Sequence, residues 1–310
     1  MEIVLLDRKT LGDDLDLASL SEFGEVTTFS TTSSFETMKR IEDVDIIITN
    51  KVVINREHMQ RASNLKLICI AATGTNNVDL EAAEELGITV KNVSGYSTTS
   101  VVQHTFTMAL SLNQRMHYYQ NLVLDGHWSD SELFTNVSRP FSEIAGKRWG
   151  IIGLGTIGKK VAHVAEAFGA SINYYSTSGK NKINDYHHSK LEELLKTSDI
   201  VSIHAPLNEA TKNLINADNL AHLKEKAILL NLGRGGIVNE EDLAKELNKR
   251  EIYAGLDVCE IEPIPETNPL LALEHPDRLL ITPHIAWASV EARQQLLLGI
   301  INNIETFLKR

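Results

Sequence analysis

The chain has 310 residues, more than one typical hydrophobic core organises, so its length favours two domains. Acidic residues outnumber basic ones by 41 to 30, and the net charge of −11 opposes binding to nucleic acid or to anionic membranes. The chain opens on a strand pattern and no apolar run is long enough to cross a bilayer, so we expect a cytoplasmic protein. Cys69 and Cys259 lie in apolar surroundings without metal-ligand spacing, which indicates core residues of a reducing compartment and no metal site.

Short apolar runs that are typical of strands alternate with helical stretches in the first part of the chain. These runs cover residues 3–6, 45–49, 67–72 and 88–93. The alternation predicts parallel βα units. Residues 99–111 are apolar at helical spacing, and we expect this helix to cross from one domain to the other.

Spaced glycines follow the apolar run 149–152 and lead into the helical stretch 159–168, which Gly169 is placed to end. Each glycine has a physical task in a dinucleotide site. One permits the tight turn, the next lets the backbone approach a pyrophosphate, and the last lets helix and strand pack closely; in chain order these are Gly153, Gly155 and Gly158. The N–H groups of the first helical turn would face the phosphate charge, which assigns Thr156 and Ile157 to the same site.

A second alternating series follows the glycines and forms a nucleotide-binding unit of its own. Its expected strands are residues 171–175, 200–204, 227–231, 254–257 and 279–282. The last stretch, 290–308, has apolar residues at helical spacing and should return to pack on the first domain. We therefore predict an α/β protein with two parallel-sheet domains, Rossmann-like or flavodoxin-like: residues 1–98 plus 287–310, and residues 99–286.

The turn after the predicted strand 171–175 lacks the acid that usually binds the ribose 2′-hydroxyl of NAD. It offers hydroxyls and lysines instead: Ser176, Thr177, Lys180 and Lys182. These groups suit a 2′-phosphate, and the alternative is a neutral loop that accepts either cofactor. The sequence leaves the choice between NAD and NADP undecided.

Further reactive side chains follow predicted strands, where open α/β sheets place their ligands. Arg234 stands among glycines and can hold a carboxylate bidentately, although a surface ion pair is the ordinary alternative. The segments 255–263 and 281–287 supply carboxylates and the imidazole of His284. A histidine beside a carboxylate is a suitable proton donor for carbonyl reduction by a nicotinamide, whereas a lone histidine is more often structural.

Over its whole length the chain resembles the D-isomer-specific 2-hydroxyacid dehydrogenases. The similarity runs from the Ala-Thr-Gly-Thr-Asn-Asn-Val-Asp loop at 72–79, through the glycines, to the Thr-Pro-His segment at 282–284. The resemblance implies an active site in the cleft between two domains, with a catalytic set of Arg234, Glu262 and His284. Glu260 is the rival carboxylate, but only Glu262 directly precedes a proline as the family motif requires. The alternative interpretation of Glu262 is a solvated acid in a loop.

The same resemblance implies the binding residues. It assigns the substrate carboxylate to the backbone N–H groups of Thr73, Gly74 and Thr75, for which a polar turn is the alternative, together with Arg234. It assigns the nicotinamide carboxamide to Asp257, the adenosine side of the cofactor to His204 and Pro206, and a further cofactor contact to Val102. We interpret His104 as structural.

Segments 95–99 and 284–287 resemble the glycerate dehydrogenase and hydroxypyruvate reductase branch of the family. We therefore expect an oxidoreductase that uses NAD(P)H to reduce glyoxylate or hydroxypyruvate to the D-2-hydroxy acid. One alternative is a D-lactate or 3-phosphoglycerate type dehydrogenase. An alternative of another class is a non-enzymatic protein that senses NADH and binds a partner.

The family resemblance also suggests a homodimer joined through the nucleotide-binding domains. Trp128, Leu133 and Phe134 lie in an otherwise polar connection and are candidates for a dimer arm within residues 118–134. The alternative is that they cover the chain's own core.

Overall fold

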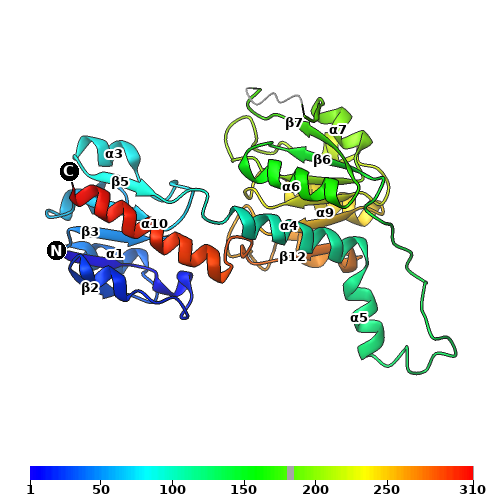
Figure 1. Ribbon diagram of the computed structural model, residues 1–310, viewed down its shortest axis with the longest axis horizontal. Helices are drawn as coiled ribbons and strands as arrows, with labels where there is room; N and C mark the ends of the chain where they lie inside the picture. Colours follow the sequence, from blue (N-terminus) through cyan, green and yellow to red (C-terminus); the bar gives the residue numbers. More distant parts are fainter. Residues whose placement is uncertain (180–184, 310) are drawn as a thin grey trace. The chain divides into compact units, whose positions relative to one another are not determined.

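The structure is a computed structural model that describes residues 1–179 and 185–309. The chain packs into two compact units, the first formed by Met1–Thr99 with Trp287–Arg310 and the second by Ser100–Ala286. In each unit, the described residues form one parallel β-sheet with helices on both faces (Figure 1).

The first unit has a five-stranded sheet in the order β2-β1-β3-β4-β5 among its described residues. Its strands are β1 (Glu2–Leu5), β2 (Glu25–Thr28), β3 (Ile46–Thr49), β4 (Leu67–Ile70) and β5 (Thr89–Asn92). Its helices are α1 (Ser34–Ile41), α2 (Arg56–Arg61), α3 (Leu80–Glu85) and α10 (Val290–Leu308), with 3-10 turns η1 (Arg8–Leu11) and η2 (Ala18–Glu22). This order is that of flavodoxin-like sheets.

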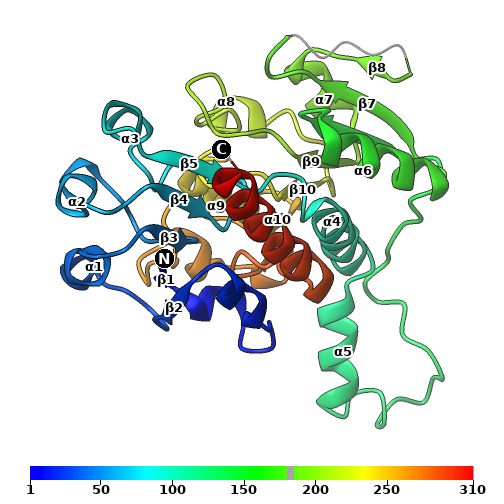
Figure 2. The same cartoon turned by 60° about the vertical axis from the view of Figure 1, so that its left-hand side comes forward.

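Side chains of each central strand alternate between two apolar cores, as a sheet covered on both faces requires. Ile46 and Ile48 of β3 belong to the core that α10 covers, whereas Ile47 belongs to the core beneath α1, α2 and α3 (Figure 2). The last helix begins where the Ser289 side chain accepts the N–H of Ala292. The apolar face expected from its helical spacing is buried against the strands of the first unit.

The second unit has a seven-stranded sheet in the order β12-β11-β10-β9-β6-β7-β8 within the described residues. Its strands are β6 (Arg148–Ile152), β7 (Ser171–Tyr175), β8 (His187–His188), β9 (Ile200–Ile203), β10 (Ile228–Asn231), β11 (Tyr253–Leu256) and β12 (Leu279–Ile281). Its helices are α5 (Met116–Leu124), α6 (Thr156–Ala167), α7 (Leu191–Thr197), α8 (Ala217–Leu220) and α9 (Glu240–Lys249), together with most of α4 (Thr98–Asn113) and the turns η3 (Pro269–Ala272) and η4 (Pro276–Arg278). Helices α4 and α6 cover one face, and α7, α8 and α9 cover the other.

The strand order of the second unit reverses between β6 and β9, which are hydrogen-bonded neighbours. Such a reversal is where open α/β sheets bind dinucleotides, at the carboxyl ends of the strands. The prediction of two parallel-sheet α/β domains is confirmed.

The sequence prediction missed β2 and β8, and it shortened two helices. Both missed strands lie at sheet edges, and β2 has no fully buried residue, so neither needs the apolar run that identifies a central strand. Helix α6 begins at Thr156 rather than residue 159 because Gly155 is its N-cap. Helix α4 extends beyond the predicted 99–111 at both ends.

Candidate active site

The glycines after β6 have different surroundings. Gly153 has a φ of 91°, and a Cβ there would lie 2.9 Å from the backbone nitrogen of Ala205. A Cβ on Gly158 would lie 2.4 Å from the carbonyl oxygen of Gly153, so this glycine allows α6 to pack closely. A Cβ on Gly155 would meet nothing within 4 Å in the described protein, so protein packing does not explain that glycine. Close approach of a pyrophosphate to the backbone does explain it, and the loop therefore fits a dinucleotide.

Helix α6 starts at this loop without a side-chain cap. Its N-cap is Gly155, which carries no side chain to accept from the first turn. Thr156 is exposed and Ile157 is half-buried at the first helical positions. The N–H groups of this turn are therefore suited to donate hydrogen bonds to an anion.

Ser176 occupies the turn directly after β7, beside the glycine loop in the sheet. Its side chain is 7% exposed, and its buried Oγ has no hydrogen-bond partner among the described residues. Thr177 follows it in the same turn, and residues 176–179 contain no carboxylate. Lys180 and Lys182 lie outside the described residues. An unsatisfied buried hydroxyl at this edge of the sheet fits a ligand that supplies its partner.

His204 follows β9 and is held by a chain of hydrogen bonds. Its Nε2 lies 3.0 Å from Ser202 Oγ, which accepts the indole N–H of Trp149 at 2.9 Å. The Nδ1 atom is buried without a partner in the described chain, and burial lowers the pKa of His204 to about 3. The ring is therefore neutral at physiological pH. Pro206, two residues on, is exposed and its carbonyl accepts the hydroxyl of Thr211 at 2.7 Å.

Arg234 lies in a turn after β10 that its neighbours fix. The side chain of Asn231 donates to the carbonyl of Arg234 at 2.9 Å and accepts the N–H of Gly233 at 3.1 Å. A Cβ on Gly235 would lie 1.8 Å from the carbonyl oxygen of Cys259, so only glycine permits this contact between the two loops. The backbone that carries Arg234 is thus fixed against the segment that leads to Glu262.

Glu262 and His284 form a direct hydrogen bond. His284 Nδ1 lies 2.7 Å from Glu262 Oε2, and Glu262 Oε1 accepts the N–H of Cys259 at 3.1 Å. The His284 side chain is 25% exposed and the Glu262 side chain is 33% exposed, so the imidazole remains accessible to solvent. The Glu262–Pro263 peptide bond is cis. Glu260, the rival carboxylate, is exposed, and its N–H is directed to Glu240.

The carboxylate of Asp257, which is 2% exposed, organises the turn around His284. It accepts the Thr282 hydroxyl at 2.7 Å and the N–H groups of Ile285 and Ala286 at 2.8 and 2.9 Å. His104 Nε2 lies 3.0 Å from the Thr282 oxygen. Since that hydroxyl donates to Asp257, His104 is the donor in this contact. Both carboxylate oxygens of Asp257 thus accept from the turn that carries His284, and the carboxamide role of Asp257 stays a prediction.

The loop Thr73-Gly74-Thr75 follows β4 in the first unit. The Asn92 side chain donates to the carbonyl of Thr73 at 2.7 Å, and the Thr73 hydroxyl donates to Val93 O at 3.3 Å. Within the described residues, no acceptor pairs with the three backbone N–H groups of this loop. They are therefore available to an anionic ligand.

Val102 is predicted to touch the cofactor, but it is only 8% exposed in α4. It packs in the apolar core between α4, α6 and the sheet. Most of the Val102 side chain is buried by this packing, and its contact with the cofactor stays a prediction.

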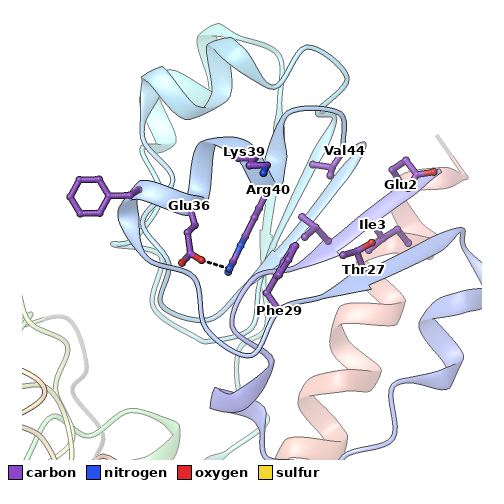
Figure 3. Close-up of a pocket in the computed structure, with 10 residues that line it drawn as sticks. Glu2, Ile3, Thr27, Phe29, Glu36, Lys39, Arg40 and Val44 are labelled. Atoms are coloured by element: carbon purple, nitrogen blue, oxygen red, sulfur yellow. Dashed lines mark hydrogen bonds and ion pairs between the residues drawn. The ribbon is translucent and has the colours of Figure 1, made fainter.

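A hollow of about 510 Å³ lies on the first unit between α1 and the edge of the sheet (Figure 3). None of the predicted site residues lines it. Arg40 lines the hollow, and its guanidinium stacks 4.0 Å above the Phe29 ring. The same guanidinium donates hydrogen bonds to the Glu36 carboxylate and to Thr32 Oγ1. The charge of Arg40 is thus paired with that of Glu36, and Lys39 is a second cation that lines the hollow.

Residues 1–179 and 185–309 contain no group of three or more His, Cys, Asp or Glu side chains placed to hold a metal ion. In the same part of the chain, no helix is long and apolar enough to span a membrane.

Comparison with known proteins gives concordant matches. A family model described as "D-isomer specific 2-hydroxyacid dehydrogenase, NAD binding domain" matches residues 106–286. A putative 2-hydroxyacid dehydrogenase of Haemophilus influenzae is 38% identical over 100% of this chain and 99% of its own length. A hydroxypyruvate reductase of Blautia hydrogenotrophica is 36% identical over 100% and 97%. A Thermus thermophilus crystal structure superposes with a TM-score of 0.88 at 32% identity, covering 100% of this chain and 97% of that one.

Proposed function

Because the chain belongs to the D-isomer-specific 2-hydroxyacid dehydrogenase family, we propose that it reduces glyoxylate or hydroxypyruvate to the D-2-hydroxy acid. It is an oxidoreductase that uses a nicotinamide cofactor. The observation that carries the assignment is the 2.7 Å hydrogen bond between His284 and Glu262. Both residues follow strands, β11 and β12, of the sheet that carries the glycine loop.

In the proposed reaction, the reduced nicotinamide supplies the hydride for the carbonyl carbon. His284 gives the proton that the carbonyl oxygen requires. With Nδ1 engaged by Glu262, the Nε2–H of the imidazolium is the donor. The carboxylate of Glu262 stabilises the charged ring, as a neighbouring anion does for any histidine.

The substrate carboxylate requires a cationic or N–H-rich site in this acidic protein. Arg234 is assigned to bind it and to polarise the carbonyl, because its guanidinium matches a carboxylate bidentately. The backbone N–H groups of Thr73, Gly74 and Thr75 are assigned to the same carboxylate. Their lack of acceptors in the described chain supports this role.

For the cofactor, the proposed contacts are the glycine loop with Thr156 and Ile157, the turn at Ser176 and Thr177, and the segment from His204 to Pro206. The absence of a carboxylate from residues 176–179 leaves room for either NAD or NADP. Asp257 is assigned to the nicotinamide carboxamide. This contact would be added to the hydrogen bonds that Asp257 already accepts from the turn at His284.

We also propose a homodimer. Helix α5 and the segment after it extend away from the sheet of the second unit (Figure 1) and expose Leu124, Leu133 and Phe134 by 71%, 68% and 90%. Exposed apolar side chains on such an extension suit a subunit interface. Light scattering coupled to size exclusion tests this: a mass near twice 34.5 kDa is expected. The two free, buried cysteines support a cytoplasmic location.

The function is tested by following NADH and NADPH oxidation with glyoxylate, hydroxypyruvate, pyruvate, phenylpyruvate and 3-phosphohydroxypyruvate. Efficient turnover of the first two substrates is expected. Preference for pyruvate or for the phosphorylated acid would contradict this specificity and indicate a D-lactate or 3-phosphoglycerate type enzyme. Tight NADH binding without turnover of any acid would contradict the enzymatic assignment.

A further inference from the structure

Glu240 is a buried carboxylate that the proposed reaction does not use. It is the first residue of α9 and is 8% exposed. Its Oε1 accepts the N–H of Glu260 and its Oε2 accepts the side-chain amide of Asn268, each at 2.6 Å. Burying a carboxylate costs free energy unless each oxygen finds a donor, and both oxygens do here.

The two donors lie on either side of Glu262 in the sequence. Asn268 is itself 9% exposed, and its side-chain oxygen caps η3 by accepting the N–H of Leu270. Glu240 therefore holds both ends of the segment 260–268, which contains Glu262. The position of that segment determines whether Glu262 reaches His284.

The loop that carries Arg234 packs against the chain where this segment begins, at Cys259 and Glu260. Gly235 packs against the Cys259 carbonyl so closely that a Cβ would lie 1.8 Å from it. Burial, and then the charges of Glu240, Glu262 and Asp257, raise the pKa of Cys259 to about 11. The three carboxylates thus act on one small region of the second unit.

We infer that Glu240 is a positioning residue, which holds the 260–268 segment so that the Glu262 carboxylate stays on Nδ1 of His284. This inference rests on the proposed function of the Glu262–His284 pair. Glutamine at position 240 keeps the size of the side chain but replaces one acceptor oxygen by an NH₂ group, which faces an N–H donor. One end of the segment is then released.

The test is a double-mutant cycle of Glu240→Gln with Glu262→Gln. We expect Glu240→Gln to lower kcat roughly 10- to 100-fold, because it removes one hydrogen bond to a charged group. The KM for the cofactor should be unchanged. The pH profile of kcat should change in the same direction as that of Glu262→Gln. In the Glu262→Gln background, Glu240→Gln should lower kcat little further. Equal losses in both backgrounds, or an unchanged pH profile, would overturn the inference.

Glu246→Gln is the matched control. Glu246 lies in the same helix with the same 8% exposure, but it pairs with Arg250 at 3.0 Å, away from the 260–268 segment. Its substitution should lower Tm and leave kcat and the pH profile unchanged. If Glu240→Gln does not fold, Asn268→Ala removes the second contact alone and should give the same non-additivity with Glu262→Gln.

A measurement without substrate separates this inference from the proposed function. The hydrogen-bonded Nδ1 proton of His284 should give a low-field NMR signal in the wild type that is lost in Glu262→Gln. We expect Glu240→Gln to shift or broaden that signal and Glu246→Gln to leave it in place. An unaltered signal in Glu240→Gln would overturn the inference even if no 2-oxo acid were reduced.

Discussion

The backbone N–H of His284 donates to the carbonyl oxygen of Asp257 at 2.9 Å, so the proposed proton donor is held by the residue that follows β11. His284 has a φ of 53°, in the left-handed region that non-glycine residues rarely adopt. The Asp257 carboxylate stabilises this conformation, because it accepts the next two N–H groups of the turn. Strain of this kind persists where the surrounding contacts over-determine it, and it concentrates at functional sites.

Asp257→Asn should therefore impair catalysis through the turn. Asparagine has one acceptor oxygen, so its NH₂ group would face an N–H donor or the Thr282 hydroxyl. We expect kcat to fall roughly 10- to 100-fold and Tm to fall as well. Steady-state kinetics and thermal unfolding check both. Asp277→Asn, on a side chain that is 43% exposed, is the control and should change neither; a normal kcat in Asp257→Asn would exclude this role.

His284→Ala removes the proposed proton donor itself. Turnover should fall about 10²- to 10⁴-fold, the usual contribution of a positioned acid, while the cofactor still binds. Stopped-flow turnover together with fluorescence titration of NADH separates the two effects. His222→Ala, at a side chain that is 33% exposed, serves as control. A nearly normal rate in His284→Ala would refute the assignment.

The pairing of Glu262 with His284 could be predicted from the sequence because of the strand order in the sheet. Both residues follow strands of one parallel sheet, and β11 and β12 are neighbours whose carboxyl ends lie at the same edge. The choice of Glu262 over Glu260 came from the family motif. Spacing alone does not distinguish two acids that are two residues apart on an irregular loop.

The contacts of the supporting residues were not predicted, although His104 was interpreted as structural. Glu240 has the pattern of an ordinary acid in the first turn of a helix, and only the path of the 260–268 segment shows that it is buried. The contact of His104 with Thr282 joins residues 178 positions apart, and it depends on how α4 crosses the sheet. Such contacts are set by loop geometry, which hydrophobic periodicity does not encode.

Gly155 and Gly235 should respond differently to alanine. Gly235→Ala forces a methyl group onto the Cys259 carbonyl and should cost at least about 1–3 kcal/mol of stability, with loss of activity. A Cβ on Gly155 meets nothing within 4 Å in the described chain, so Gly155→Ala should keep its Tm but weaken NADH binding. Thermal unfolding and NADH titration of both variants test this. The dinucleotide assignment of Gly155 would be wrong if its alanine variant bound NADH normally.

The two cysteines should be unreactive in the folded protein. Burial raises the pKa of Cys69 to about 12 and that of Cys259 to about 11, and both are free thiols. The thiolate is the nucleophile, so neither should react with Ellman's reagent near neutral pH. Both should react after unfolding in guanidinium chloride. Rapid labelling of either thiol in the native protein would contradict their placement in the core.

His204 should make the protein less stable in mild acid. An unfolded histidine has a pKa of about 6.5, whereas burial lowers the pKa of His204 to about 3. Between these values the unfolded chain binds the extra proton, so the free energy of unfolding falls as the pH drops through this window and stops falling below about pH 3. The loss should reach about 2 kcal/mol between about pH 7 and pH 5.

Burial is the reason why the ring resists protonation. A charged ring would carry an N–H on both nitrogens, and the buried Nδ1 has no partner among the described residues. Its Nε2 lies 3.0 Å from Ser202 Oγ. His204→Gln should therefore flatten the dependence of unfolding free energy on pH between about pH 7 and pH 5, as measured by urea unfolding. His187→Gln, at a side chain that is 69% exposed, should leave that dependence intact. The assignment fails if both variants keep the wild-type slope.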